Sequence, residues 1–517
     1  MPVSCARRQL TAHAGGLLLL CLVVMVTCPA AASPTSPAAS PRSRFADAPL
    51  SVRPVGVFTQ VYNDSGTGAD DDLSIWRPQV SQTPGYFSLG DVAMAGQGTP
   101  PATSFVISGP TDALAPPVDY RLTWTDHGSG GDQDGSVWAP VAPPGYQCLG
   151  SVAAAGYDKP STGLVRCVKS LYLVAGTAVK VWDDAGSGAD SDLGIWQSDP
   201  SDAQGLSAST FIARPSHTDT GGPELYKVLD KTRIDASVWS RGPVTAATAR
   251  AFAPRVWLHS KEEYFPSGVG YFLPHVHEAS GYLVTNEPLG CDTCTDPPFL
   301  RGQRPDRNAV DVYAEIAPRT RNGAATNVTD IFYWMFFPYN RGKDVCVGWD
   351  SPMGCVGGTK SFGNHVGDWV HLAIRFVDGL ASQVYVSAHS AGALYTFGDK
   401  NLALTPDWRP VVYAGQGSHE LYANPGRHIY HDLPNGGHLA DETDHGTLWD
   451  TATALTPYTW QPAGTYTGSL SWLNISSRWG NRGSGCLPAP VSQCVLEDGP
   501  VPLMARDYAQ PPLMPLD

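Results

Sequence analysis

A loop rich in glycine and aspartate, ending in a tryptophan, occurs three times in the first half of the chain. The copies run from Asn63 to Trp76, from Thr125 to Trp138 and from Asp183 to Trp196. Short apolar stretches bounded by Gly/Asp clusters lie within each copy, a pattern typical of β-hairpins. A unit of roughly 60 residues cannot bury its apolar face alone. The repeat therefore predicts one closed β domain with pseudo-threefold symmetry and a β-prism-like arrangement.

The residue pattern of the sequence changes from Ala253 onward, where the Gly/Asp-rich repeat no longer occurs. Strand-like segments alternate there with loops that hold most of the histidines, a pattern that favours a β-sandwich. Because helical periodicity is absent, the predicted fold class is all-β. We expect a three-repeat β domain at residues 48–245, followed by a His- and Asp-rich β-sandwich domain at residues 246–517.

The first residues have the layout of a secretory signal. Arg7 and Arg8 precede an apolar run, and small alanines follow it. This pattern predicts a cleavable signal peptide at residues 1–32, and the Ser/Pro/Ala-rich residues 33–47 read as a flexible leader. No later stretch approaches the roughly 18 apolar residues that span a bilayer, so no transmembrane anchor is predicted. We expect the protein to be secreted and extracellular, or vacuolar by way of the secretory pathway.

The charge balance bears on the class of partner. The 517 residues contain 34 Lys+Arg and 48 Asp+Glu, for a net charge of −14. An acidic chain without a Lys/Arg run repels a phosphate backbone, which argues against general nucleic-acid binding. A hydrophobic content of 42%, with 15 Trp and 21 Tyr, supplies material for packed cores and argues against disorder.

The cysteines support an oxidising compartment. Those outside the signal fall into sequence-local pairs, which we interpret as disulfides: Cys148 with Cys167, Cys291 with Cys294, Cys346 with Cys355, and Cys486 with Cys494. The sequence alone leaves this connectivity open, and the Cys291/Cys294 spacing also suits redox chemistry or zinc. Three Asn-x-Ser/Thr patterns predict a glycoprotein, with acceptors at Asn63, Asn327 and Asn474.

Two sets of residues carry a family resemblance. In the repeats they are Ser74 to Pro78, Pro84 to Tyr86 and Leu89 to Asp91; in the second region they are Pro254 to Ser260, Phe336 to Gly342, Gly363 to Trp369, Val386 to Ser390, Gly417 to Tyr422, Pro425 to His428 and Asp441 to Asp444. The repeats resemble the adaptor-binding repeats of bridge-like lipid-transfer proteins. The mature chain as a whole resembles the vacuolar protein sorting-associated protein sixty-two (Vps62-like) family. The resemblance implies a role connected with vacuolar protein sorting.

Part of the second region is also similar to the necrosis-inducing Nep-like cytolysins. That family has a lectin- or actinoporin-like β-sandwich, and a divalent cation in an acidic cavity contributes to binding sphingolipid sugars. Of its Gly-His-Arg-His-Asp-Trp-Glu motif, His365, Asp368 and Trp369 match here, whereas Val370 stands in place of the glutamate. Asn340 stands in place of an upstream aspartate. Two of the family's carboxylates are therefore missing.

A cluster of imidazoles and carboxylates in the second region is the strongest candidate site. Such groups on loops of one sandwich end suit Zn²⁺ or another divalent metal with an open position for water. The alternative is that they are hydrogen-bonded groups that close loops. The candidate metal residues are His365, Asp368, His389, His419, His428, Asp441, Glu442 and Asp444.

The repeat loops are the second candidate site. Alternate acids in a Gly-rich loop can converge on Ca²⁺, although aspartates also cap their own turns. We interpret Trp76, Trp138 and Trp196 as core anchors rather than sugar platforms. The calcium-loop candidates are Asp64, Asp70, Asp72, Asp126, Asp132, Asp134, Asp184, Asp190 and Asp192.

These patterns favour a secreted or vacuole-routed binding protein that engages a glycan, a glycolipid or membrane surface, or a protein adaptor. The alternative is a metal-dependent hydrolase acting on an extracellular or vacuolar polymer. In the hydrolase, His365 and Asp368 would hold a divalent Ca, Mg or Zn ion, and Glu420 or Glu442 would act as base. Metal content separates the two hypotheses.

Overall fold

The computed structural model describes most of the chain from Ala48 onward. The described residues are 48–81, 83–235, 243–290, 296–346, 349–351, 354–389, 391–433, 437–487 and 494–506. The predicted signal peptide and leader, and the Cys291/Cys294 pair, lie outside them.

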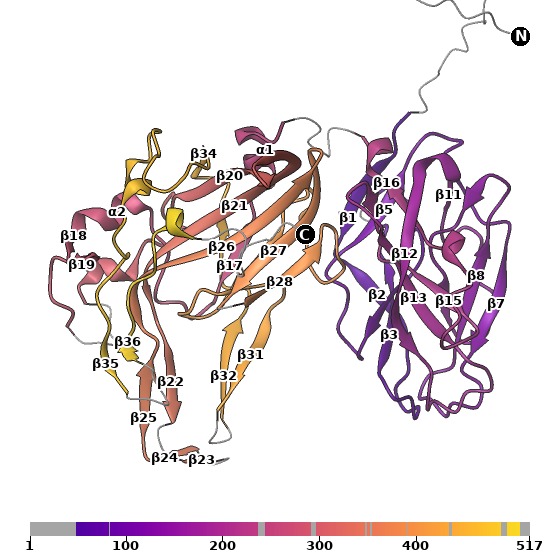
Figure 1. The fold of residues 1–517 in the computed structure, drawn as a ribbon. Helices are drawn as coiled ribbons and strands as arrows, with labels where there is room; N and C mark the ends of the chain where they lie inside the picture. The colour runs from indigo at the N-terminus through magenta and orange to yellow at the C-terminus, as the bar shows by residue number, and fades with distance from the viewer. Residues whose placement is uncertain are drawn as a thin grey trace, which may run out of the picture. The chain divides into compact units, whose positions relative to one another are not determined.

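Each sequence repeat contributes three antiparallel strands, with the strand that carries the tryptophan in the middle (Figure 1). In copies one and two these strands form a three-stranded sheet, and in copy three they belong to a five-stranded sheet. The strands are β2 (Phe58–Asn63), β3 (Leu73–Pro78) and β4 (Val92–Ala95) in copy one, β7 (Asp119–Thr125), β8 (Gly135–Val141) and β10 (Val152–Ala155) in copy two, and β12 (Leu173–Asp183), β13 (Gly194–Pro200) and β15 (Phe211–Arg214) in copy three. Shorter strands pair around them: β1 (Ser51–Val55), β5 (Ser104–Ser108), β6 (Leu114–Ala115), β9 (Tyr146–Gln147), β11 (Cys167–Lys169), β14 (Gly205–Leu206) and β16 (Lys227–Asp230). Hairpins are thus the repeating unit, as the sequence predicts.

A register shift at the same place in each copy directs an aromatic side chain toward the next copy. The shifts lie between Gln60 and Tyr62, between Leu122 and Trp124, and between Lys180 and Trp182. A bulge of this kind re-aims the residue that follows it. Trp124 Nε1 donates to Ser191 O at 2.9 Å, and Trp182 Nε1 donates to Asp71 O at 2.6 Å. The Tyr62 ring packs edge-on against Trp124. Each copy therefore contacts the next, and the third contacts the first.

The Gly/Asp loops close in the same cyclic order. The backbone hydrogen bonds run from Asp132 N to Ser65 O, from Asp190 N to His127 O and from Asp70 N to Ala185 O, at 2.7, 2.7 and 2.8 Å. Gly66 has a φ of +82°, and a Cβ there would lie 2.7 Å from Asp132 Oδ1. Glycine is therefore required where the loops approach one another. Closure of three copies follows the predicted pseudo-threefold order, while the β-prism geometry itself stays a prediction.

The repeat tryptophans are core residues. Trp76, Trp138 and Trp196 are 8%, 7% and 9% exposed. The aromatic residues before the loops pack with apolar residues of all three sheets into one further cluster, which includes Ile75, Val137 and Ile195. The prediction that the three tryptophans anchor the core is confirmed.

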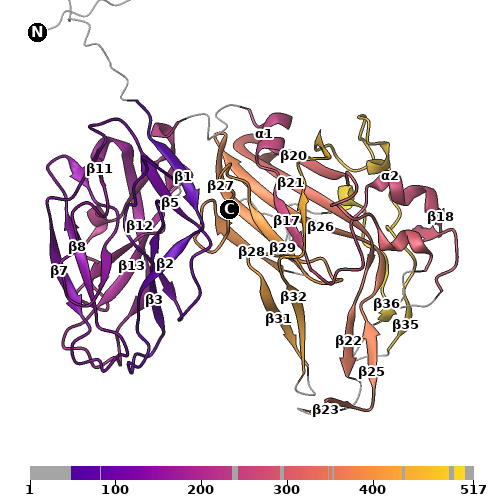
Figure 2. The ribbon, with the colours of Figure 1, turned by 180° about the vertical axis from the view of Figure 1, so that it is seen from behind.

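The second region contains two sheets packed face to face (Figure 2). The six-stranded sheet has the order β28 (Ala391–Thr396), β27 (Leu380–Ala388), β26 (His365–Val377), β21 (Ala324–Asn340), β20 (Val312–Arg321) and β34 (Leu455–Thr459). The four-stranded sheet has the order β30 (Leu421–Tyr422), β29 (Val411–Ala414), β17 (Arg255–Leu258) and β33 (Thr447–Asp450). Helices are short, with α1 at Ala246–Ala251 and α2 at Val269–Phe272. The all-β fold class is confirmed.

Both faces of the central strand β26 are buried. Val370, Leu372 and Ile374 pack into the core shared with the four-stranded sheet. Trp369 and Ala373 belong to a separate aromatic cluster on the opposite face. The period of two along a strand gives this alternation. Burial on both faces explains the near-continuous apolar run of β26. Its polar residues are His365 and Asp368 near the start, the buried His371, and Arg375, which pairs with the buried Asp330.

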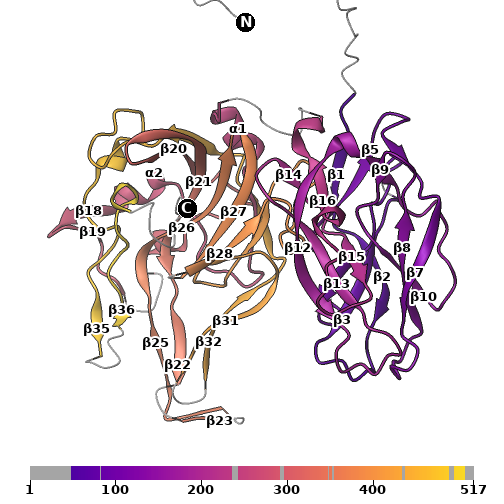
Figure 3. The ribbon, with the colours of Figure 1, turned by 45° about the vertical axis from the view of Figure 1, so that its right-hand side comes forward.

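Narrow two-stranded ribbons extend from the sandwich. The ribbons β22 (Lys343–Cys346) with β25 (Thr359–Phe362) and β31 (Gly426–Asp432) with β32 (His438–Thr443) leave the same end of the sheets (Figure 3). The remaining pairs are β18 (Val276–Ala279) with β19 (Tyr282–Thr285), β23 (Trp349–Ser351) with β24 (Gly354–Val356), and β35 (Ser484–Cys486) with β36 (Cys494–Leu496). The ribbons β22/β25 and β31/β32 thus bring distant segments of the sequence to one end of the sandwich.

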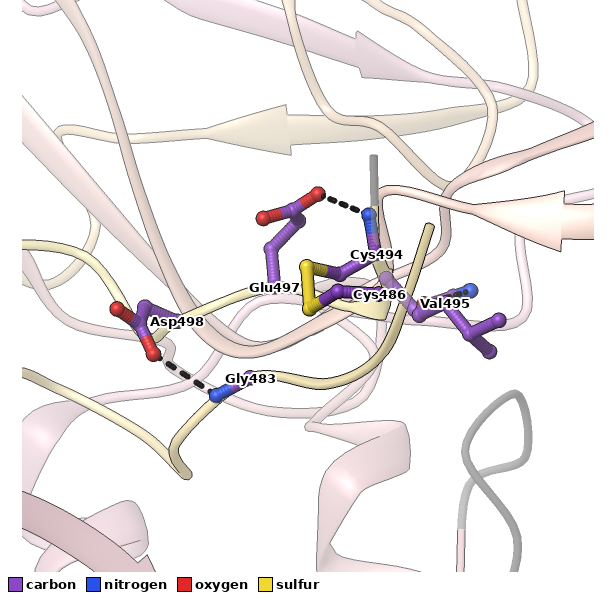
Figure 4. Close-up of a disulfide and its surroundings, with 7 residues drawn as sticks. Gly483, Cys486, Cys494, Val495, Glu497 and Asp498 are labelled. Carbon is purple, nitrogen blue, oxygen red and sulfur yellow. Dashed lines mark hydrogen bonds between the residues drawn. A yellow bond between two sulfur atoms is a disulfide. The ribbon is translucent and has the colours of Figure 1, made fainter. Parts of the chain in front are cut away.

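Three of the four predicted disulfides are confirmed. They are Cys148–Cys167, Cys346–Cys355 and Cys486–Cys494, each joining neighbours in sequence. Beside the last one, Glu497 accepts a hydrogen bond from Cys494 N and Asp498 accepts one from Gly483 N (Figure 4). In the described part of the chain no helix is long and apolar enough to cross a membrane.

The two regions share apolar and polar contacts. Phe105 of β5 stacks on Trp408 with ring centroids 5.2 Å apart. The fully buried Lys231 donates from Nζ to Ala203 O and to Ala381 O of β27. These contacts do not test whether each region folds alone, so the division at residue 245 stays a prediction.

Candidate functional site

A cavity of about 1450 Å³ opens at the end of the sandwich from which the ribbons extend. Residues of β22, β25, β26, β27, β30, β31 and β32 line it, together with the loops between them. Its polar lining comes from Lys343, His365, Asp368, His389, Glu420, Tyr422, His428, Tyr430, Glu497 and Asp498 among others. Four of the predicted metal candidates, namely His365, Asp368, His389 and His428, therefore face one cavity.

Asp441 of β32 organises the hydrogen bonds beneath this lining. Its carboxylate is fully buried and accepts from His389 Nε2 at 2.7 Å, Tyr422 OH at 2.7 Å, Ser418 Oγ at 2.5 Å and Lys343 Nζ at 2.6 Å. Burial acts to raise the pKa of Asp441, but the hydrogen bond from His389 and the charge of Lys343 hold that pKa well below its usual range. Its four acceptor sites are thus used by protein donors.

Glu420 is the second acid of the cavity, and its side chain is half-buried, with 19% of it exposed. Its Oε1 lies 3.5 Å from His389 Nδ1. Burial raises the pKa of Glu420 to about 8, against the lowering effect of His389, and the charges of Asp368 and Asp441 raise it further. Glu420 is therefore a carboxylic acid at neutral pH, and it both donates and accepts hydrogen bonds.

His419 supports the cavity from behind. The imidazole is fully buried and stacks on Phe337 of β21 with centroids 3.8 Å apart. Its Nε2 lies 2.9 Å from Tyr264 O, to which it donates, and its Nδ1 lies 3.3 Å from Asp368 Oδ2. His419 therefore links the loop before β30 to β26 and orients Asp368.

Aromatic rings form flat walls next to these polar groups. His428 stacks on Tyr422 at 3.8 Å with an interplanar angle of 7°. The His389 ring lies 3.7 Å from that of Tyr430. Tyr430 and its neighbour Ile429 on β31 are 36% and 53% exposed. The ribbon thus presents accessible apolar surface beside the carboxyl groups.

Two of the predicted metal candidates lie away from the cavity lining. Glu442 is an exposed side chain that pairs with Arg427 Nε at 3.3 Å. Asp444 accepts from Ser260 N at 2.6 Å and lies 3.5 Å from His259 Nε2. Their positions correspond to the loop-closing alternative. Sequence reasoning missed Lys343, Tyr422 and Tyr430 as site residues. Tyr422 ends a family-like segment, whereas Lys343 and Tyr430 carry no signal in the sequence.

The residues at the cytolysin-like cation positions do not fit a hard divalent cation. Asn340 donates from Nδ2 to Gly363 O at 2.9 Å. Val370 is buried in the core and has no oxygen to offer. His365 Nδ1 lies 2.6 Å from Gly367 O, so Asp368 alone brings a carboxylate. Hard cations take several oxygen ligands. A softer metal bound by imidazoles of this cavity stays a prediction.

The acids of the repeat loops have three different placements. The first acid of each loop is buried, and Asp64 Oδ1 and Asp184 Oδ1 accept from Leu73 N and Leu193 N of their own loops at 2.9 and 2.8 Å. The second acid of each loop donates a backbone hydrogen bond to the neighbouring loop; these are Asp70, Asp132 and Asp190. The third acid of each loop has an exposed side chain; these are Asp72, Asp134 and Asp192. Calcium binding by these loops stays a prediction.

The three predicted glycan acceptors are all in contact with the protein. Asn327 Nδ2 donates to Asp378 and Asn474 Nδ2 donates to Tyr466 O, both at 2.8 Å, while Asn63 Oδ1 accepts from Ser65 N. Asn327 and Asn474 are exposed. Their glycosylation stays a prediction.

A family model described as vacuolar protein sorting-associated protein 62 matches residues 37–280 and 302–483. Vacuolar protein sorting-associated protein 62 of Saccharomyces cerevisiae is 26% identical over 284 residues, covering 44% of this chain and 58% of the relative. The yeast putative vacuolar protein sorting-associated protein TDA6 is 30% identical over 324 residues, covering 50% and 65%. The chain thus spans about three fifths of the length of these curated relatives.

Two solved structures show partial similarity to this chain. GNIP1Aa from Chromobacterium piscinae is 26% identical, with 36% of this chain and 38% of that chain covered and a TM-score of 0.32. Necrosis and ethylene inducing protein 2, from the causal agent of cocoa's witches' broom disease, is 15% identical, with 37% and 74% covered and a TM-score of 0.20.

Proposed function

We infer the function from family and site together: the chain belongs to the vacuolar protein sorting-associated protein 62 family. Membership points to a role related to vacuolar sorting. We propose that the protein enters the secretory pathway and acts there by binding a hydroxyl-rich ligand, a glycan or the sugar headgroup of a glycolipid. The cavity at the end of the sandwich is the proposed binding site.

The observation that carries this proposal is the mixture of groups in that cavity. A neutral acid, Glu420, stands beside the carboxylate of Asp368, and the rings of Tyr422, Tyr430 and His428 lie next to them. Sugar hydroxyls need both donors and acceptors, and the apolar faces of sugar rings pack on flat aromatic surfaces. A cavity with a few convergent polar groups among aromatic walls is typical of small-molecule sites.

The acidic groups favour amino sugars over neutral sugars. Asp368 and Glu420 line the cavity together with His389. Lys343, which also lines it, is already paired with Asp441. An ammonium group is attracted by an ionised carboxylate, and more strongly at low salt. Glucosamine and glucose make a matched pair of probes because they differ by one ammonium group.

Calorimetric titration of the full chain with these two sugars tests the proposal. We expect glucosamine to bind more tightly than glucose, and Asp368→Asn to remove most of the difference. Tyr430→Ala should weaken both sugars. Arg427→Ala is the matched control, because Arg427 lies on the same ribbon and faces away from the cavity toward Glu442. Binding that is absent from the wild type, or unchanged in Asp368→Asn and Tyr430→Ala, contradicts the proposal.

A hydrolase is the second candidate, and Glu420 is the residue that favours it. A carboxylic acid that is protonated at neutral pH and lies next to an imidazole has the properties of a general acid. Mass spectrometry of oligosaccharides incubated with the protein tests this candidate. Product that disappears in Glu420→Gln, while sugar binding is retained, would establish turnover.

The repeat region supplies a second binding surface in this proposal. Its resemblance to adaptor-binding repeats supports a protein partner for residues 48–245. Cross-linking of the purified protein to partners in a vacuolar membrane fraction, followed by competition with the isolated repeat region, tests it. Retention of the same partner by the chain without residues 48–245 would contradict this assignment.

A further inference from the structure

The three repeat copies differ at one position that faces the buried loop aspartate. In copy one Gln97 Nε2 donates to Asp64 Oδ1 at 3.0 Å. In copy two Tyr157 OH donates to Asp126 Oδ1 at 2.8 Å. In copy three the position is taken by His217, whose Nε2 lies 2.6 Å from Asp184 Oδ1. The same architectural position thus holds an amide, a phenol and an imidazole, and of these the imidazole is the common ligand of zinc-class metals.

His217 completes a set of three ligand atoms in copy three. Its Nε2 lies 3.8 Å from Asp192 Oδ1, in addition to the contact with Asp184. Within the described part of the chain, Asp184, Asp192 and His217 form the one group of imidazole and carboxylate ligands whose atoms all lie within 4.8 Å of one another. Ligand atoms of tetrahedral zinc, about 2.0–2.2 Å from the metal, are about 3.3–3.6 Å apart. The separations of 2.6 and 3.8 Å bracket that spacing.

We propose that the third repeat binds a divalent transition metal ion of the zinc class through Asp184, Asp192 and His217. Water completes the coordination on the exposed side, where the Asp192 and His217 side chains are 68% and 32% exposed. Asp184 is buried, so the proposed ion would lie at the inner side of the site, next to the protein core. The site is separate from the sandwich cavity and does not depend on the proposed sugar binding.

The surroundings hold Asp184 in place for this role. Leu193 N donates to its Oδ1 at 2.8 Å, and Trp124 Nε1 of copy two donates to its Oδ2 at 3.1 Å. A carboxylate oxygen that accepts one hydrogen bond keeps a lone pair for a metal. Hydrogen bonds of this kind orient ligating carboxylates in metal sites. Metal entry therefore needs only the hydrogen bond between His217 and Asp184 to open, with release of its proton.

The ligand set selects against calcium. Ca²⁺ takes six to eight oxygen ligands, whereas this group offers two carboxylates and one imidazole nitrogen. The mixed set suits Zn²⁺ or Co²⁺. Copies one and two keep both carboxylates, with Asp64 and Asp72 or Asp126 and Asp134, but lack the nitrogen, so they serve as internal controls.

Equilibrium dialysis of the chelator-stripped full chain against Zn²⁺, with metal counted by mass spectrometry, tests the site. We expect one Zn²⁺ bound by the wild type to be lost from His217→Gln, with an affinity at least about tenfold lower. His217→Gln restores the residue of copy one and keeps a hydrogen-bond donor to Asp184, so the fold should persist. Tyr157→Gln makes the same replacement in copy two and should keep the Zn²⁺.

Co²⁺ as a probe gives a second readout, because its visible absorption reports tetrahedral coordination. The band should appear in the wild type and in Tyr157→Gln, and be absent from His217→Gln and Asp192→Asn. Zn²⁺ should raise the melting temperature of the wild type more than that of His217→Gln, because a metal bound only to the folded state stabilises it. A wild type without Zn²⁺, or equal Zn²⁺ retention by His217→Gln, would show that His217 is only a hydrogen-bond donor and would overturn the proposal.

Discussion

The repeat region and the sandwich region both bury aspartates, but they satisfy them with different partners. In the repeats, Asp64 and Asp184 accept from backbone N–H groups of their own loops. In the sandwich, Asp441 accepts only from side chains, among them His389 and Lys343. Backbone donors carry no net charge and do not titrate, whereas His and Lys do. The contrast is therefore between carboxylates held in place by uncharged backbone donors and a carboxylate beneath the cavity whose partners His389 and Lys343 can carry charge.

A buried ion pair between Arg77 and Asp91 joins two of the repeats and illustrates a purely structural role for an acid. Asp91 is fully buried and receives two hydrogen bonds from Arg77, at 2.9 and 2.8 Å, and one from Ala153 N of copy two at 2.8 Å. Arg77 also donates to Ala153 O. The pair therefore fastens copy one to copy two. Copy two has Ser151 in the corresponding place, which accepts from Ala213 N of copy three.

Removal of this acid should have the largest effect. Asp91→Ala leaves the Arg77 guanidinium without its counter-ion, and breaking such a buried pair costs about 3–5 kcal/mol. We expect a loss of about 3 kcal/mol in the free energy of unfolding, because Arg77 is 25% exposed. Urea unfolding measures it. Asp119→Ala is the control, since its pair with Lys159 is exposed and screened by water, and it should change the free energy of unfolding far less than Asp91→Ala does. Equal effects would contradict the assignment.

Asp441→Asn is the corresponding test in the sandwich. An amide cannot accept all the hydrogen bonds that reach this carboxylate, and it leaves Lys343 without a buried counter-charge. We expect a loss of about 2–3 kcal/mol in the free energy of unfolding. Sugar binding should also fall, which distinguishes this variant from Asp91→Ala. Asp441→Asn with wild-type sugar affinity would place Asp441 among the purely structural acids.

Glu420→Gln tests the pH dependence expected of the acid next to His389 in the sandwich. The folded-state pKa of Glu420, about 8, is raised above its ordinary value of 4.5. The stability linked to its proton is therefore fully present below pH 4.5 and is lost as the pH rises through 8. Glu420→Gln should remove this loss and be more stable than the wild type at pH 9, on the order of 2 kcal/mol.

Chemical denaturation at pH 5 and pH 9 measures the Glu420 effect. Glu442→Gln supplies the comparison with an exposed acid, because Glu442 lies on β32 and its side chain is 52% exposed. A Glu420→Gln curve parallel to that of the wild type would show that the carboxyl is ionised throughout this range.

How much the sequence predicts differs between the two regions for a physical reason. The repeat occurs in three sequence copies, so its hairpins, loop glycines and core tryptophans could be predicted from the local residue pattern alone. Tyr62, Trp124 and Trp182 contact the next copy because a β-bulge precedes each of them. The residue pattern does not predict these bulges, so it does not predict the cyclic contacts.

The sandwich site was predicted only in part. His365, Asp368, His389 and His428 stand in family-like segments and do face one cavity. Lys343 and Tyr430 join it because two ribbons extend from the same end of the sandwich, a tertiary arrangement that residue spacing does not encode. Glu442 and Asp444 belong to the same segment as Asp441, but strand alternation and the following turn direct them elsewhere.

The smallest effect should come from a hydrogen bond that the repeats themselves show to be dispensable. Trp76 Nε1 donates to Ser74 Oγ at 3.0 Å and Trp138 Nε1 to Ser136 Oγ at 2.9 Å. In copy three glycine replaces that serine, and the buried Trp196 Nε1 has no hydrogen-bond partner among the residues that the structure describes. Ser74→Ala reproduces in copy one the arrangement of copy three. We expect it to cost about 1 kcal/mol, because Trp76 Nε1 loses its acceptor and Gly96 O loses the donor Ser74 Oγ, while the packing is kept. Ser74→Ala combined with Ser136→Ala should cost the sum of the two single variants in thermal unfolding, since the copies bury these indoles separately. A combined loss well above that sum would mean that the three copies share one cooperative hydrogen-bond network, and that the tolerance of copy three depends on the other two.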